Sequence, residues 1–298
     1  MYYSASKPVK RILLSLMLVP ALLLVAGTFL AGLFITGEQS LDYFPLIGKT
    51  TLSLHAYSAL FHSSVFYRSL LFSLGISLAS TVIAALFALI LAQGLRRYSS
   101  KQGGWLHFML QFNLPVPHVV GAISLVLLLG QSGLISRLAY AAGLIQQPSQ
   151  FPILILDQAG IGIMLEYVWK EVPFIAVSVL SILKSWIVPY EKQLQLLGAN
   201  AWQRWRLVTL PFMLPSLTAS SIIVFAYTFG SFEVPYVLGS VSKPTLPILA
   251  YQAYLNPDLT HRSEAMAING VITIISLLLI VLYMRWGEGY ATKQHSSS

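Results

Sequence analysis

The feature that most constrains the fold of this chain is a set of long segments without a charged residue. Charged residues make up only 9% of the 298 residues and the mean hydropathy is +0.72, whereas soluble domains are about 25% charged. Each charge-free segment reaches the roughly 20 helical residues that cross a hydrocarbon layer of about 30 Å. The chain is therefore predicted to be a polytopic membrane protein. The charge-free segments are residues 12–36, 69–95, 106–136, 207–232 and 265–284.

Residues 160–183 form a further apolar segment, whose first half contains Glu166, Lys170 and Glu171. We predict an all-α fold with about six transmembrane helices, of which this fourth one is the least clear. The first helix is expected to be retained, because its apolar run exceeds the roughly 7–15 residues of a signal-peptide core and no small-residue cleavage site follows it. We expect residues 1–298 to form a single transmembrane domain with its core at about 69–285.

The distribution of Lys and Arg predicts the orientation, because cationic residues resist translocation. Twelve of the 18 basic residues lie on one side of the predicted spans. Both termini, and the connection before the fifth span, are therefore expected to be cytoplasmic. The twelve are Lys7, Lys10, Arg11, Arg96, Arg97, Lys101, Lys184, Lys192, Arg204, Arg206, Arg285 and Lys293.

Composition also excludes several functions. The net charge of +8 is dispersed at membrane edges rather than clustered on one face, so we expect no nucleic-acid partner. The chain has no cysteine, which excludes disulfides and thiolate metal sites. No His or carboxylate cluster has metal-ligand spacing, and no G-x-x-x-x-G-K phosphate loop is present. We therefore predict a transport protein, not an enzyme, without a cofactor or metal, whose energy source lies on another chain.

The connection before the fifth span, at about residues 184–210, is the longest on the cytoplasmic side. Pro189 suits the start of a helix, where N–H groups are unpaired. Gly198 suits the left-handed position that ends a helix, and Asn200 is a competent N-cap for a second short helix. We predict two short helices with a turn at Gly198, the second ending at Leu210-Pro211.

The second short helix carries Trp202 and Trp205 at three-residue spacing, with Arg204 and Arg206 on other faces. Two tryptophans flanked by arginines are typical of hot spots in protein interfaces. The alternative is that the tryptophans anchor the helix at the membrane surface and that the arginines only follow the charge rule.

The same residues carry a family resemblance. The pattern G-A-x-x-W-x-x-(aromatic)-x-x-V-x-L-P-x-x-x-P resembles the EAA loop of permease subunits in binding-protein-dependent ABC importers of the type I (MetI-like) fold. The family's Glu-Ala-Ala segment aligns here with Lys192, Gln193 and Leu194, and Glu191 lies one position early. The matching residues are Gly198, Ala199, Trp202, Trp205, Val208, Leu210, Pro211 and Pro215.

Three further segments extend the resemblance over about residues 69–267. Residues 113–118, in the third predicted span, resemble a proline-containing segment that is common in these permeases. Residues 169–174 and 232–239 resemble segments found in polyamine, ferric-iron and sulfate-type importers. This resemblance does not select one of these substrates.

The resemblance implies the permease of an ABC importer in the bacterial inner membrane, surrounded by membrane lipid. Its implied partners are ABC ATPase subunits, an identical or sister permease, and a periplasmic or extracellular substrate-binding protein. The loop would then contact the ATPase and couple ATP-driven closure to the pathway. The residues implied for this coupling loop are Glu191, Gly198, Ala199, Trp202, Arg204, Trp205, Leu210 and Pro211.

Charged residues inside the membrane are candidates for the pathway, because each costs about 2.5–3.5 kcal/mol on insertion scales. Glu166 and Lys170 lie four residues apart, so they form either a structural ion pair or part of a pore or gate. Glu233 and Pro235 lie where proline loosens the outer half of the fifth span, and a kink with a solvated glutamate is the alternative. His118 is either a pathway residue or a packing residue.

An ion-coupled secondary transporter is the alternative function. It would use Glu166, Lys170 or Glu233 as its coupling site, and it would need no ATPase.

Overall fold

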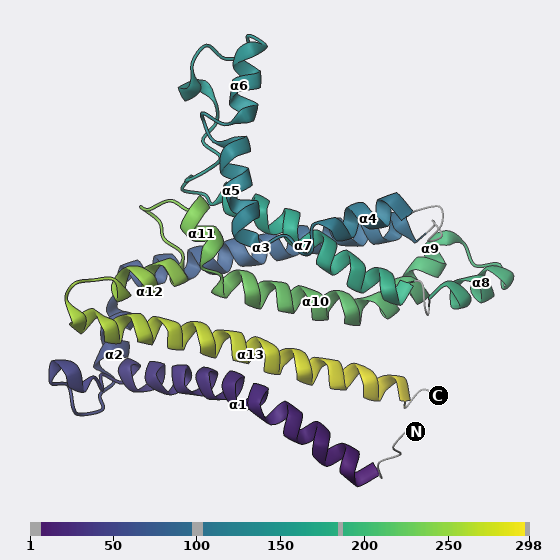
Figure 1. Ribbon diagram of the computed structural model, residues 1–298. Coiled ribbons are helices and arrows are strands. Elements are labelled where there is room, and N and C mark those ends of the chain that lie inside the picture. The colour runs from purple at the N-terminus through teal and green to yellow at the C-terminus, as the bar shows by residue number, and fades with distance from the viewer. Residues whose placement is uncertain (1–6, 97–103, 184–186, 296–298) are drawn as a thin grey trace, which may run out of the picture. The chain divides into compact units, whose positions relative to one another are not determined.

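The computed structural model describes residues 7–96, 104–183 and 187–295. Within these ranges the chain consists of helices and turns, with one isolated β-bridge and no strand (Figure 1). This confirms the all-α class. Arg97, Lys101 and Lys184, used above for the orientation, lie outside the described residues. The main helices are α1 (Lys7–Ser40), α2 (His55–His62), α3 (Ser64–Leu95), α4 (Gly104–Phe112), α5 (His118–Leu129), α6 (Leu134–Ala141), α7 (Ile161–Ile182), α8 (Val188–Leu196), α9 (Ala201–Arg204), α10 (Leu210–Gly230), α11 (Glu233–Leu238), α12 (Leu246–Tyr254) and α13 (Arg262–His295).

Among the described residues, five helical segments are long and apolar enough to cross a membrane. The helix α7 is a sixth candidate by length, because its 22 residues rise roughly 33 Å, although three of them are charged. The prediction of about six transmembrane helices is therefore close to the structure. The five segments are Leu16–Ser40, Ser64–Leu95, His118–Ala141, Ala201–Gly230 and Leu259–Val281.

The third predicted span, residues 106–136, is not one continuous helix. The structure has α4 and α5 instead, separated by residues 113–117. Pro115 and Pro117 lie in this break, and a proline removes a backbone donor and clashes with the preceding turn of a helix. Pro117 is the N-cap of α5, with φ −61° and ψ 142°. The apolar pattern thus predicted the membrane location but not the break.

The described chain divides into two compact units, one of residues 1–63 and 250–271 and one of residues 64–249 and 272–298. The single transmembrane domain expected from the sequence stays a prediction.

In the first unit, Asp42 organises the segment after α1. It is buried, and its carboxylate accepts hydrogen bonds from Lys49 Nζ at 2.7 Å and from the Ala56 N–H at 3.1 Å. Burial opposes ionisation, but the hydrogen bond from Lys49, the Lys49 charge and the Ala56 N–H hold the pKa of Asp42 below its usual value. An ionised Asp42 therefore ties the turn at Lys49 to the start of α2.

The second unit is built on α3 and α7, which pack together, with α10 against both (Figure 1). Small residues recur every fourth position on α3, at Ala84, Ala88 and Ala92, and all three are fully buried. They belong to one core cluster with Ile175 and Val179 of α7. Small side chains let helix backbones approach closely, which is how helices associate in a lipid environment.

The start of α7 is fixed by Asp157 and Gly160. The Asp157 carboxylate accepts hydrogen bonds from the N–H groups of Ala159, Ile161 and Gly162 at 2.9, 3.0 and 3.3 Å, which satisfies free donors at the helix N-terminus. Gly160 is the N-cap, with φ +75°. A Cβ atom there would lie 2.5 Å from Ile76 Cδ1.

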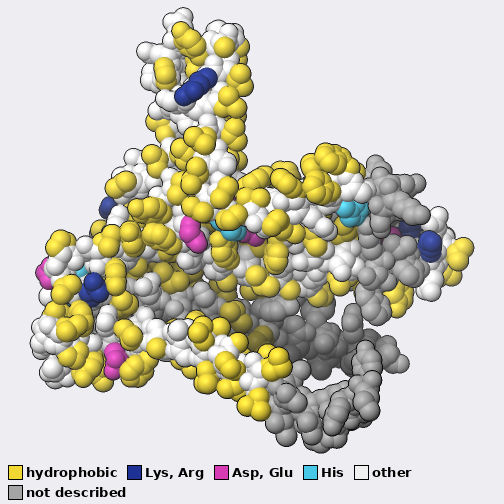
Figure 2. Space-filling view, in the orientation of Figure 1, with side chains coloured by type: hydrophobic (Ala, Val, Ile, Leu, Met, Phe, Trp, Pro, Cys, Tyr) yellow, Lys and Arg dark blue, Asp and Glu magenta, His cyan; other side chains and the backbone are white. Residues whose placement is uncertain are grey.

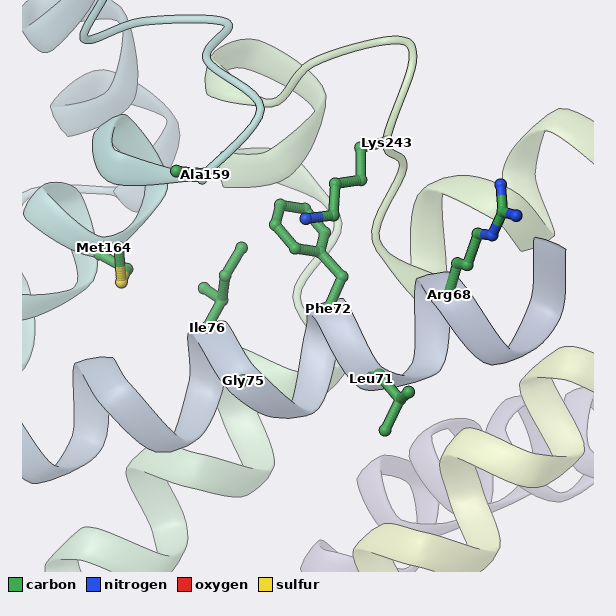
Figure 3. Close-up of a pocket in the computed structure, with 8 residues that line it drawn as sticks. All are labelled: Arg68, Leu71, Phe72, Gly75, Ile76, Ala159, Met164 and Lys243. Carbon is green, nitrogen blue, oxygen red and sulfur yellow. The ribbon is translucent and has the colours of Figure 1, made fainter. Parts of the chain in front are cut away.

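A groove of about 600 Å³ lies beside this turn. Figure 3 shows Phe72 and Ile76 of α3 on its floor, with Lys243 folded over the Phe72 ring. The Lys243 ammonium nitrogen is 4.4 Å from the ring centroid, a cation–π contact. Gly75 also lines the groove, but no atom would come within 4 Å of an added Cβ.

We predict that Gly160→Ala lowers the free energy of unfolding by about 1–3 kcal/mol, because it combines a left-handed backbone with a clash against Ile76. Gly75→Ala, on the same groove but in a regular helix, should be neutral or stabilise by up to about 1 kcal/mol. Thermal unfolding of the two variants in detergent checks this. Equal melting temperatures for the two variants would contradict it.

Candidate functional site

The two predicted short helices and the turn between them at Gly198 are confirmed at residues 188–204. We call this segment the bracket. Gly198 ends α8 with φ +84°, the left-handed conformation expected of it. Asn200 caps α9 in a reciprocal capping box: the Gln203 N–H donates to Asn200 Oδ1 at 2.9 Å, and the Asn200 N–H donates to Gln203 Oε1 at 2.8 Å. Arg204 closes the turn by donating to the Ala199 carbonyl at 2.9 Å.

The tip of the bracket presents large apolar side chains to the outside. Leu196, Leu197 and Trp202 are 89%, 82% and 62% exposed. The Trp202 ring stacks on Trp205, with centroids 5.0 Å apart and an interplanar angle of 19°. Large exposed apolar patches are typical of interaction surfaces.

The expected end of the second helix at Leu210-Pro211 is wrong. One helical segment runs from Ala201 to Gly230 and passes through a π-helical turn, η4 (Trp205–Thr209), into α10. Pro211 lies in the first turn of α10 and has no N–H to donate. Such wide turns occur inside continuous helices where the regular hydrogen-bond ladder is interrupted. The bracket is thus a direct extension of a membrane helix.

Glu191 points inward rather than toward the exposed tip. Its Oε1 lies 2.7 Å from Arg96 Nη1, at the end of α3, and it also accepts a hydrogen bond from the Thr209 hydroxyl of η4. The Glu191 and Arg96 side chains are only 17% and 20% exposed, and Thr209 is fully buried. Glu191 therefore braces α8 against α3 and the π-helical turn. The sequence indicated neither partner.

Lys170 does not form the predicted ion pair with Glu166. Its ammonium group instead donates to the carbonyls of Asn113 and Val116, at 2.7 and 2.6 Å, inside the break between α4 and α5. The Asn113 amide in turn donates to the Trp169 carbonyl at 2.8 Å. The Asn113 carbonyl also accepts the Val116 N–H at 3.2 Å, and Pro117, four residues further on, has no N–H to offer it. The buried ammonium adds a donor to both carbonyls of this break.

His118, the first residue of α5, lies between two glutamates of α7. Its Nδ1 is 3.2 Å from Glu166 Oε1, and its Nε2 is 3.7 Å from Glu171 Oε1. Glu166 is fully buried and Glu171 is 7% exposed. The His118 ring also lies against Tyr227 of α10, with centroids 4.6 Å apart. In the view of Figure 2, acidic and histidine side chains lie close together near α5 and α11.

Glu233 and Pro235 lie on α11, which follows a break in the helix after Gly230. Glu233 is exposed and accepts a hydrogen bond from the Ser231 hydroxyl at 3.3 Å, whereas Pro235 is buried. The helix α11 packs against α5 and α7. The four residues named as pathway candidates thus belong to helices in mutual contact. His118 and Glu171, named in the sequence without a firm role, join the same cluster.

Comparisons with known proteins agree with this architecture. Residues 84–288 match the family model of the binding-protein-dependent transport system inner membrane component. The molybdenum transport system permease protein ModB of Mycobacterium tuberculosis is 25% identical over 72% of this chain and 76% of its own length. The inner membrane ABC transporter permease protein YdcU of Escherichia coli is 26% identical over 83% and 79%.

A solved structure shows the same fold. It is a crystal structure of a bacterial ABC transporter involved in the import of the polysaccharide alginate, with a TM-score of 0.71 and 19% identity. The match covers 95% of this chain and 97% of the other. The chain therefore belongs to the family of binding-protein-dependent transport inner membrane components, the multi-pass permease subunits of ABC importers.

Proposed function

We propose that the bracket is the coupling loop of this permease and that its exposed tip docks on a separate ABC ATPase. The observation that carries the proposal is the stacked pair of Trp202 and Trp205, presented on a rigid turn at Gly198. Tryptophan and arginine are enriched in the hot spots of protein interfaces. The capping box and the Arg204 contact hold this surface in place before a partner binds, which lowers the entropy cost of association.

The proposed assembly contains this chain, a second permease that is identical or a sister, and ATPase subunits on the cytoplasmic side. A soluble binding protein delivers the solute on the other side. Both termini and the coupling loop are cytoplasmic in this arrangement, as the distribution of Lys and Arg indicates. Binding and hydrolysis of ATP on the partner would drive alternating access in the membrane.

We further propose that the face formed by Glu166, Lys170, Glu233 and Pro235, together with His118, lines the solute pathway. These residues lie near two helix breaks, one between α4 and α5 and one between α10 and α11. Broken helices near the middle of a membrane protein are a recurrent way to expose polar groups to a solute. Each ionisable residue inside the membrane costs insertion free energy, so such residues commonly serve a function such as lining a solute pathway.

Trp202→Ala should weaken the binding of the ATPase, because it removes the exposed half of the stacked pair. A hot-spot loss of about 2 kcal/mol corresponds to roughly 30-fold in affinity. The measurement is copurification of the ATPase with the permease in mild detergent, alone and with Arg204→Ala added. Tyr140→Ala, an equally exposed aromatic on α6, is the matched control. Full retention of the ATPase by the double variant would contradict the proposal.

Breaking the brace between Arg96 and Glu191 should uncouple the loop without releasing it. We expect Glu191→Arg to reduce uptake per ATP hydrolysed by about tenfold, the value of one charged hydrogen bond, while the ATPase still copurifies. Combining it with Arg96→Glu reverses the pair and should restore part of the coupling. Lys192→Gln, a neighbouring exposed position, should couple normally. Normal coupling in both single charge variants would rule out the brace.

A further inference from the structure

The proposed pathway face carries an excess of carboxylates. Glu166, Glu171 and Glu233 lie on it, against the single ammonium of Lys170. That ammonium already donates to two backbone carbonyls, and within the described ranges it forms no ion pair with Glu166 or Glu171. The three acidic groups are therefore not neutralised by direct contact with the lysine.

One buried acceptor atom on this face, Glu166 Oε1, has no hydrogen-bond donor among the described residues, and Glu166 is 0% exposed. His118 Nδ1 approaches Glu166 Oε1 to 3.2 Å, but the hydrogen-bonding contact of that ring is to Oε2, at a long 3.5 Å. A buried acceptor without a donor costs free energy. Because Glu166 Oε1 is an acceptor, the group that would complete the site must donate.

Aromatic rings border the carboxylates. Tyr227 lies against His118, and Phe232 stacks on Tyr236 beside Glu233, with centroids 5.1 Å apart. Aromatic faces attract cations through their quadrupole, most strongly when the cation is partly desolvated. Carboxylates combined with aromatic rings recognise an organic ammonium better than an inorganic anion.

A metal ion fits this face less well. Across the described residues, no group of three or more His, Cys, Asp or Glu side chains is placed to hold one metal ion. An oxyanion such as sulfate would need donors, and it would meet three carboxylates of its own charge sign.

We propose that this face binds an organic cation with N–H donors as the transported solute. This inference rests on the proposed function, since it assigns a substrate class to the proposed pathway. In the structure, the His118 ring occupies the space between Glu166 and Glu171, where the cationic group of the solute would lie once the ring turns aside.

The test uses the complete importer of permeases, ATPase and binding protein in proteoliposomes. Uptake of radiolabelled 1,4-diaminobutane, thiamine and sulfate is measured with and without ATP inside. We expect ATP-dependent accumulation of at least one of the two cations, and a loss of at least about tenfold in Glu171→Gln. Glu264→Gln is the matched control, a glutamate on α13 that contacts His261 at 3.0 Å, and it should transport normally.

Three outcomes would overturn the substrate class. One is that neither cation accumulates although the ATPase copurifies and hydrolyses ATP. Another is that sulfate accumulates and Glu171→Gln leaves its uptake unchanged or raises it. The third is that cation uptake survives Glu171→Gln intact. In all three the coupling-loop proposal stands, whereas a permease that retains no ATPase would defeat the proposed function itself.

Discussion

The ammonium group of Lys170 holds α7 against the break between α4 and α5, next to the contacts of His118 with Glu166 and Glu171. Carbonyls at a helix break find no water inside a bilayer, so they bind a donor from the protein. Lys170 supplies that donor to the carbonyls of Asn113 and Val116. The same bonds anchor the segment just before α5, whose first residue, His118, lies within reach of Glu166. The Lys170 ammonium group thus binds backbone carbonyls instead of a glutamate. The carboxylates nearby therefore outnumber the lysine that could pair with them.

The helix α3 connects this polar face to the proposed coupling loop. It packs along α7 through its buried alanines, of which Ala88 is central, and it ends at Leu95, next to Arg96. Arg96 pairs with Glu191 of the loop. A displacement of the loop would therefore pass to α3 and α7 through contacts that are buried or ion-paired at each step. Close packing makes such elements move as bodies rather than deform.

Sequence patterns predicted the features that depend on local chemistry. Charge-free runs located the membrane helices, and Gly198 and Asn200 were identified from their backbone and capping preferences, which tertiary context did not override. What the sequence did not indicate depends on distant contacts. The pairing of Glu191 with Arg96 spans 95 residues, and that of Lys170 with the Asn113 carbonyl spans 57. Spacing along one helix favoured Glu166 as the partner of Lys170, and only the three-dimensional fold shows that the carbonyls bind it instead.

The most direct test of the central claim is whether the bracket touches the ATPase during transport. Because the chain has no cysteine, a single Ala201→Cys substitution on α9 can carry a thiol-linked photo-crosslinker without competing sites. The assembled importer should then yield a crosslink to the ATPase from Ala201, and none from a matched Ala141→Cys, which is likewise an exposed position and lies on α6. Crosslinking to the ATPase from α6 alone, or no crosslink from Ala201 while ATP-driven uptake proceeds, would contradict docking through this loop.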